Sequence, residues 1–238
     1  MSWIFQIPFF KERMMVITLH NRGVGKSSRP NYPYTMDMYL QDIKKLLEHL
    51  KVREKIHLCG LSMGGMIAQN YVLKYPNTVR TLILCATSSF HPESAVNAII
   101  ESQQLMDKFD LEQKLKVRIA ALYSRSFHKR LKIDKELYQK IRQNFMERPT
   151  RLQDWINQSA AIINHDIRDS LHKIQQPTLI MVGNEDKILT GLEHSELLHE
   201  KIPNSRFEII QNVGHRFIDE EPEKVNQIIW DFIRENMN

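Results

Sequence analysis

The stretch that most constrains the fold runs from Lys55 to Ala68, where an apolar segment meets Gly-Leu-Ser-Met-Gly and passes into a helical pattern. Glycines on both sides of Ser62 let the backbone turn sharply where a side chain would clash. The pattern predicts a strand, a strained elbow and a helix, with Ser62 Oγ at the apex. The N–H of Met63 can then face a developing oxyanion, at the positive end of the helix dipole. Because such motifs are common, an ordinary glycine-rich turn is the competing interpretation.

Apolar segments alternate with amphipathic ones along much of the chain. Short apolar runs predict buried strands, and apolar residues at helical spacing predict helices between them. Thr35 is the expected N-cap of the first long helix. The expected strands are 14–19, 56–59, 79–86, 178–183 and 207–210, and the expected helices are 35–50, 63–75, 191–200 and 222–234. This alternation predicts an α/β fold, a mainly parallel sheet with helices on both faces.

Between residues 88 and 169 the strand pattern is absent, and helical stretches are interrupted by Pro92 and Pro149. We therefore expect a core made of residues 1–87 and 170–238, with residues 88–169 inserted as a helical cap over the strand ends. Ligands of such sheets bind at the carboxyl ends of the strands. Most aromatic and methionine side chains of the cap are expected in its core, and a few in an apolar acyl pocket. The aromatic and methionine side chains considered, for core and pocket together, are Met106, Phe109, Tyr123, Phe127, Phe145, Met146 and Trp155.

The 238 residues fit one large domain or one domain with an insertion. No apolar run approaches the length of a membrane span, and no basic leader precedes the apolar residues at the start. The two cysteines, Cys59 and Cys85, lie within apolar runs and are expected to be small buried hydrophobes in a reducing compartment. We therefore expect a cytoplasmic protein without a membrane association.

Positive charge is concentrated in residues 108–151, which hold 13 Lys/Arg and 5 Asp/Glu, an excess of +8 against +5 for the whole chain. The basic residues alternate with apolar ones, as in Leu115-Lys116-Val117-Arg118-Ile119. This spacing favours a solvated helix face over an anion-binding surface. The excess of positive charge weakly favours acidic substrates or an anionic partner. We infer no nucleic-acid binding from it.

A nucleophilic serine requires a base, and the base requires an acid that orients it. Asp186 follows the expected strand 178–183, and His215 follows the expected strand 207–210. Both residues should therefore lie at the same sheet edge as Ser62. Three separate loops that bring a nucleophile, an acid and a base together predict a catalytic triad much more specifically than the elbow alone. Glu185 is the alternative acid.

The chain resembles the α/β-hydrolase superfamily, in its capped, cofactor-free esterase and lactonase branch. The resemblance rests on Asn21–Ser27, Gly60–Gly65, Gly183–Asp186 and Gly214-His215, and it extends over nearly the whole chain. It implies a Ser62 nucleophile, a His215 base, an Asp186 orienter and an acyl-enzyme hydrolysed by water. The implied substrate is a small ester or lactone. Enol-lactonases, carboxylesterases, carbon–carbon bond hydrolases and perhydrolases share this elbow. The elbow alone therefore does not decide which of these reactions the chain would catalyse.

The chain departs from the family pattern at two places. His20 stands where the family usually has an aspartate before its Arg-Gly loop, a structural position. The family's first strands and its His-Gly loop, which supplies a second oxyanion N–H, have no counterpart here. A shortened start, a smaller sheet or completion by a second chain would each explain this. A homodimer that covers the exposed sheet edge is one hypothesis, and an inactive ligand-binding or scaffold protein is the alternative function.

Two other patterns invite misinterpretation. Gly23-Val24-Gly25-Lys26-Ser27 resembles a phosphate-binding loop, but the first glycine of that motif would fall on His20 and prolines follow. We reject that interpretation. The ten histidines show no metal-ligand spacing, and His194 and His199 are expected on a helix surface. Neither a metal nor a cofactor is therefore expected.

Overall fold

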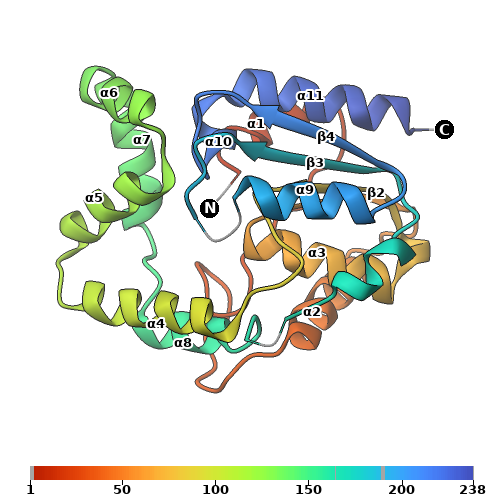
Figure 1. The fold of residues 1–238 in the computed structure, drawn as a ribbon, viewed down its shortest axis with the longest axis horizontal. Helices are drawn as coiled ribbons and strands as arrows, with labels where there is room; N and C mark the ends of the chain where they lie inside the picture. Colours follow the sequence, from red (N-terminus) through yellow and green to blue (C-terminus); the bar gives the residue numbers. More distant parts are fainter. Residues whose placement is uncertain (1–2, 164, 189–190, 238) are drawn as a thin grey trace.

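The fold is organised around a sheet of parallel strands, as Figure 1 shows. The computed structural model describes residues 3–163, 165–188 and 191–237. Within them, four strands lie in the order β1-β2-β3-β4, all parallel. They are β1 (Ile56–Leu61), β2 (Val79–Cys85), β3 (Thr178–Gly183) and β4 (Ser205–Ile210). The predicted parallel α/β fold is confirmed.

Helices cover both faces of the sheet because successive strand side chains point to opposite sides. Leu82 and Leu84 of β2 pack in one core cluster, whereas Ile83 and Cys85 pack in another. The first cluster is covered by α2 (Met36–His49), α3 (Met63–Lys74) and α9 (Leu192–Lys201). The second is covered by α1 (Ile7–Phe10), α10 (Phe217–Glu220) and α11 (Pro222–Glu235). Thr35 caps α2 as predicted, accepting a hydrogen bond from the N–H of Met38.

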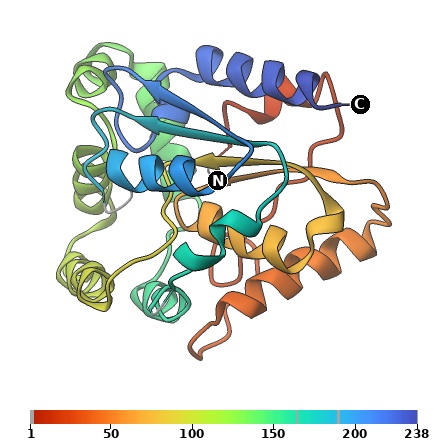
Figure 2. The ribbon, with the colours of Figure 1, turned by 45° about the vertical axis from the view of Figure 1, so that its right-hand side comes forward.

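The described residues between 88 and 163 form helices joined by short connections, and they gather on one side of the sheet at the carboxyl ends of the strands (Figure 2). We call α4 to α8 the helical segment: α4 (Glu93–Asp107), α5 (Leu111–Leu122), α6 (Arg125–Ile133), α7 (Lys135–Met146) and α8 (Leu152–Ser159). Two short 3-10 helices, η1 (Pro76–Thr78) and η2 (Arg168–Lys173), lie in other connections.

The two connections between the helical segment and the sheet lie side by side. Phe90 and Asp166 form an antiparallel bridge. The N–H of His91 donates to the carbonyl of His165 at 3.2 Å, and the N–H of Ile167 donates to that of Ser89 at 3.0 Å. The chain therefore enters and leaves the helical segment at a single point.

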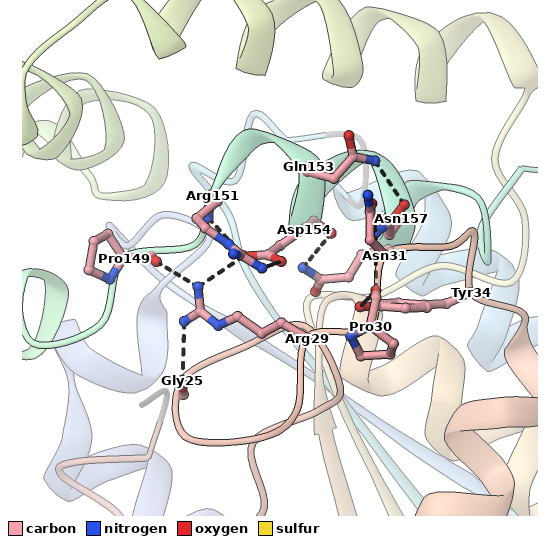
Figure 3. Close-up of polar contacts among 11 residues, drawn as sticks. Gly25, Arg29, Pro30, Asn31, Tyr34, Pro149, Arg151, Gln153, Asp154 and Asn157 are labelled. Atoms are coloured by element: carbon pink, nitrogen blue, oxygen red, sulfur yellow. Dashed lines mark hydrogen bonds and ion pairs between the residues drawn. The ribbon is translucent and has the colours of Figure 1, made fainter.

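A second attachment joins α8 to the loop before α2, and Figure 3 shows its polar contacts. The Asp154 carboxylate, whose side chain is 1% exposed, accepts from Arg29 at 2.9 Å and from Arg151 at 2.8 and 2.9 Å. The N–H of Tyr34 donates to the carbonyl of Asn157 at 2.9 Å. Burial alone would raise the pKa of Asp154, but the two arginines outweigh it and hold that pKa below its usual range. These contacts hold α8 to the core at a point separate from the bridged connections.

The strand predicted at residues 14–19 is wrong. These residues form an irregular connection, and no backbone hydrogen bond joins residues 15–19 to another described residue. Met15 and Leu19 are exposed, and no described strand pairs with this apolar run. In the described chain β1 pairs only with β2, which leaves β1 at the sheet edge.

The loop that follows is nevertheless well supported, although it carries His20 at the family's aspartate position. The ring of His20 packs where a side chain on Gly25 would lie, and its carbonyl accepts from Ser27 Oγ at 2.5 Å. Arg22 makes a bidentate contact with Asp42 of α2, with both hydrogen bonds at 2.7 Å.

Across the described residues, every helix is too short or too polar to cross a membrane.

Candidate active site

Ser62 occupies a strained elbow between β1 and α3, as predicted. Its backbone has φ 54° and ψ −125°, which a residue with a side chain rarely adopts. Its N–H donates to the carbonyl of Cys85 at 2.9 Å, and its own carbonyl accepts from Thr87 Oγ1 at 2.7 Å. These bonds at the carboxyl end of β2 hold the elbow and prevent its backbone from relaxing.

Two glycines make this elbow sterically possible. A Cβ on Gly60 would lie 2.3 Å from the carbonyl oxygen of Gly64, and a Cβ on Gly65 would lie 2.5 Å from Cβ of Thr87. Gly64 is different, because a Cβ there would meet no heavy atom within 4 Å. The prediction that glycines flank Ser62 for steric reasons therefore holds for Gly60, while Gly65 rather than Gly64 supplies the space on the helical side.

Asp186 and His215 are brought together by neighbouring strands. β3 and β4 end in register, with Gly183 opposite Ile210, and the two residues follow in the loops beyond. His215 Nδ1 lies 2.8 Å from Asp186 Oδ2, with the two side chains 5% and 0% exposed. The other Asp186 oxygen accepts from the N–H of Ile188 at 2.9 Å. In this structure the carboxylate beside His215 is that of Asp186 and not the alternative, Glu185.

The loop that carries His215 is fixed by a carboxylate that the sequence did not single out. Glu220 of α10 is 2% exposed, and its Oε1 accepts from the N–H of Gly214 at 2.8 Å and from that of Ser124 at 3.1 Å. Its Oε2 accepts from the hydroxyl of Ser124. Burial raises the pKa of Glu220, while these hydrogen bonds oppose that rise. Glu220 thus connects the His215 loop to the residue that caps α6.

Ser62, Met63 and His215 line one large cavity of about 1620 Å³. The cavity extends from the elbow, beneath the helical segment, along the open edge of β1. Trp155 and Met106, two of the side chains considered for an acyl pocket, also line it. Met63 is the first residue of α3, where backbone N–H groups have no acceptor within the helix. The predicted oxyanion donor therefore lies beside Ser62, at the wall of this cavity.

The profile of the alpha/beta hydrolase fold family matches residues 1–222 of this chain. The chain belongs to the α/β-hydrolase fold family. The family resemblance drawn from the motifs is therefore confirmed.

Individual relatives of this α/β hydrolase include lactonases and esterases. It is 26% identical to 3-oxoadipate enol-lactonase 2 of Acinetobacter baylyi, over 95% of this chain and 81% of that protein. A thermophilic esterase from Thermogutta terrifontis, with malate bound, superposes with a TM-score of 0.87 at 28% identity, over 100% of this chain and 86% of that one. An esterase from Exiguobacterium antarcticum gives 0.83 at 26% identity, over 98% and 87%. These similarities support a hydrolase of the α/β family.

Proposed function

We propose that this α/β hydrolase cleaves a small carboxylic ester or lactone through an acyl-enzyme on Ser62. The observation that carries the proposal is the juxtaposition at one cavity of a strained serine elbow and a buried His215–Asp186 pair. The enol-lactonase and esterase relatives support the same reaction class. In this proposal α4 to α8 act as the cap that covers the substrate.

The geometry suggests how each group would act. Because His215 Nδ1 faces Asp186, Nε2 is the ring nitrogen that would take the proton from Ser62 Oγ as the oxygen attacks the carbonyl carbon. The buried Asp186 carboxylate would stabilise the resulting imidazolium. The N–H of Met63 would donate to the oxyanion, and the imidazolium would return its proton to the leaving oxygen. Water would then attack the acyl-enzyme, with His215 again as the base.

Labelling by a fluorophosphonate tests the nucleophile directly, because phosphonylation needs an activated serine and not a complete catalytic cycle. We expect one label per chain, located on Ser62 by peptide mass spectrometry, and hydrolysis of short p-nitrophenyl esters. Ser62→Ala should lose both, and His215→Gln should slow the labelling strongly. Folded protein that neither takes the label nor cleaves these esters would overturn the proposal.

Turnover and labelling together distinguish an active enzyme from a weak one. Removing one oxyanion donor typically slows turnover by about 10²–10³-fold. If Met63 is the sole effective donor, Ser62 should still reach one label per chain, while ester hydrolysis is slow because acylation and deacylation both pass through an oxyanion. A low kcat/KM for short p-nitrophenyl esters, with one label per chain, is the expected signature of this case. Fast release of p-nitrophenol in the first turnover would contradict it, because it would show that acylation is fast.

A further inference from the structure

Arg118 lies in a different environment from the one that its sequence pattern predicts. The alternation of basic and apolar residues places it on a solvated helix face, but its side chain is half-buried and lines the same cavity as Ser62 and His215. The prediction is wrong for this residue because α5 presents Arg118, Ala121 and Leu122 to the cavity. Lys116, two residues earlier, is exposed and does not line it.

The contacts of the Arg118 guanidinium are aromatic. It lies over the ring of Trp155, 5.1 Å from the ring centre, and over that of Phe145 at 5.6 Å. No carboxylate in the described part of the chain forms an ion pair with it. Burial, followed by the charge of Arg216, lowers the pKa of Arg118 to about 10, so the group stays protonated at neutral pH. Aromatic faces stabilise a cation only partly, since they replace neither a counter-ion nor the lost water.

Three other charged side chains that line the cavity have partners of opposite charge. Arg216, next to His215, contacts Asp219 at 2.7 and 2.8 Å, and Asp219 also accepts from the hydroxyl of Tyr123 at 2.8 Å. Glu147, which lines the cavity below α7, pairs with Lys26 at 4.0 Å. Among the described residues that line the cavity, eight are lysine or arginine and two are glutamate, but four of the cations (Lys51, Arg53, Lys55 and Arg80) lie at the amino ends of β1 and β2, away from Ser62. Arg118 is therefore a cation that an anionic ligand entering this cavity could pair with directly.

We propose that Arg118 forms a carboxylate-binding subsite, and that the preferred substrates carry a free carboxylate in addition to the ester or lactone that reacts. A planar guanidinium fits a carboxylate through two parallel hydrogen bonds, and the ring of Trp155 beneath it restricts its orientation. A hemiester of a dicarboxylic acid, or a lactone with a carboxylate side chain, has the required chemistry. The substrate class rests on the proposed function, whereas the carboxylate subsite does not.

Kinetics with matched esters tests the specificity. The p-nitrophenyl hemiesters of succinate, glutarate and adipate are compared with neutral esters of equal chain length, and the readout is the ratio of their kcat/KM values. In Arg118→Gln this ratio should fall about 10- to 100-fold, mainly through KM, because a charge-assisted hydrogen bond is lost. Arg118→Lys should retain part of the preference, and the control Lys116→Gln should retain all of it. An equal loss for both esters would mean that Arg118 only packs against its aromatic neighbours, and would overturn the proposal.

Binding to protein without the nucleophile separates the two proposals. Glutarate is titrated calorimetrically into Ser62→Ala and into Ser62→Ala/Arg118→Gln, with circular dichroism to confirm that both are folded. Binding that is lost with Arg118 supports the subsite even if the protein hydrolyses no ester. Ester hydrolysis by the unmodified chain, combined with glutarate binding that is absent or independent of Arg118, would refute the subsite and leave the proposed function intact.

Discussion

The elbow at Ser62 stores backbone strain, and replacing the serine by glycine should release it. At φ 54° and ψ −125° the residue lies outside the regions that L-residues favour. Such a conformation costs about 1–3 kcal/mol. It cannot relax locally, because hydrogen bonds to Cys85 and Thr87 hold the peptide units on both sides of Ser62. Glycine adopts this conformation without the Cβ clash.

The expected gain is the released strain minus the entropy that glycine loses. Glycine costs about 0.5–1 kcal/mol relative to alanine through the greater freedom of the unfolded chain. Ser62→Gly should therefore be about 1 kcal/mol more stable than Ser62→Ala, within a range of about 0–2.5 kcal/mol. Ser62→Ala is the matched control because it also removes the hydroxyl but keeps the Cβ. The difference in stability between the two variants therefore measures the backbone strain at residue 62, less the entropy cost of glycine.

Urea unfolding followed by circular dichroism measures the difference, and similar slopes for the two variants would show that the same surface is exposed. For a chain of this length, 1 kcal/mol corresponds to a Tm difference of about 2–4 °C. Neither variant should take a fluorophosphonate label. If Ser62→Gly proves no more stable than Ser62→Ala, the elbow is not strained in the way described.

Three further predictions concern stability. Asp154→Asn should lower the free energy of unfolding by about 3 kcal/mol in urea titrations, because it leaves two arginines around a neutral group; a loss below about 1 kcal/mol would contradict this. Gly60→Ala should prevent stable folding, since its Cβ meets a backbone oxygen at 2.3 Å, whereas Gly64→Ala should change stability little; equal effects in a thermal melt would refute the steric argument. Burial lowers the pKa of both His91 and His165 to about 4, so the unfolded chain binds protons more readily below about pH 6.5. The free energy of unfolding should thus fall between about pH 6.5 and 4, by about 3 kcal/mol per histidine, and the double Gln variant should show a flatter profile; an unchanged profile would refute this.

Local pattern combined with the regularity of parallel sheets was sufficient to predict the candidate site. Ser62, Asp186 and His215 each follow a strand, and the carboxyl ends of parallel strands meet at one edge. Their approximate meeting could therefore be predicted without knowing any side-chain contact. The helical character of residues 93–159 was predictable as well, because apolar spacing distinguishes helices from strands.

The contacts made across long sequence separations could not be predicted in this way. Glu220 bonds to Ser124, 96 residues earlier, and nothing in the acidic run around it indicates that partner. Arg118 shares the periodicity of its exposed neighbours, and only the packing of α5 over the cavity turns it inward. The run at 14–19 shows the opposite error, since its composition fits a strand but a strand also requires a neighbour with which to pair.

The bonded crossing at Phe90 and Asp166 has a consequence for how such a protein can change over evolution. Because the chain leaves the sheet and returns at one bridged point, the length and content of the excursion hardly affect the register of β2 and β3. Selection can lengthen, shorten or exchange the helices, and so reshape the pocket, while the elbow stays in place, provided that the contact between Ser124 and Glu220 that supports the His215 loop is kept. The same bridge marks where an engineer could graft the helices of a related hydrolase onto this sheet.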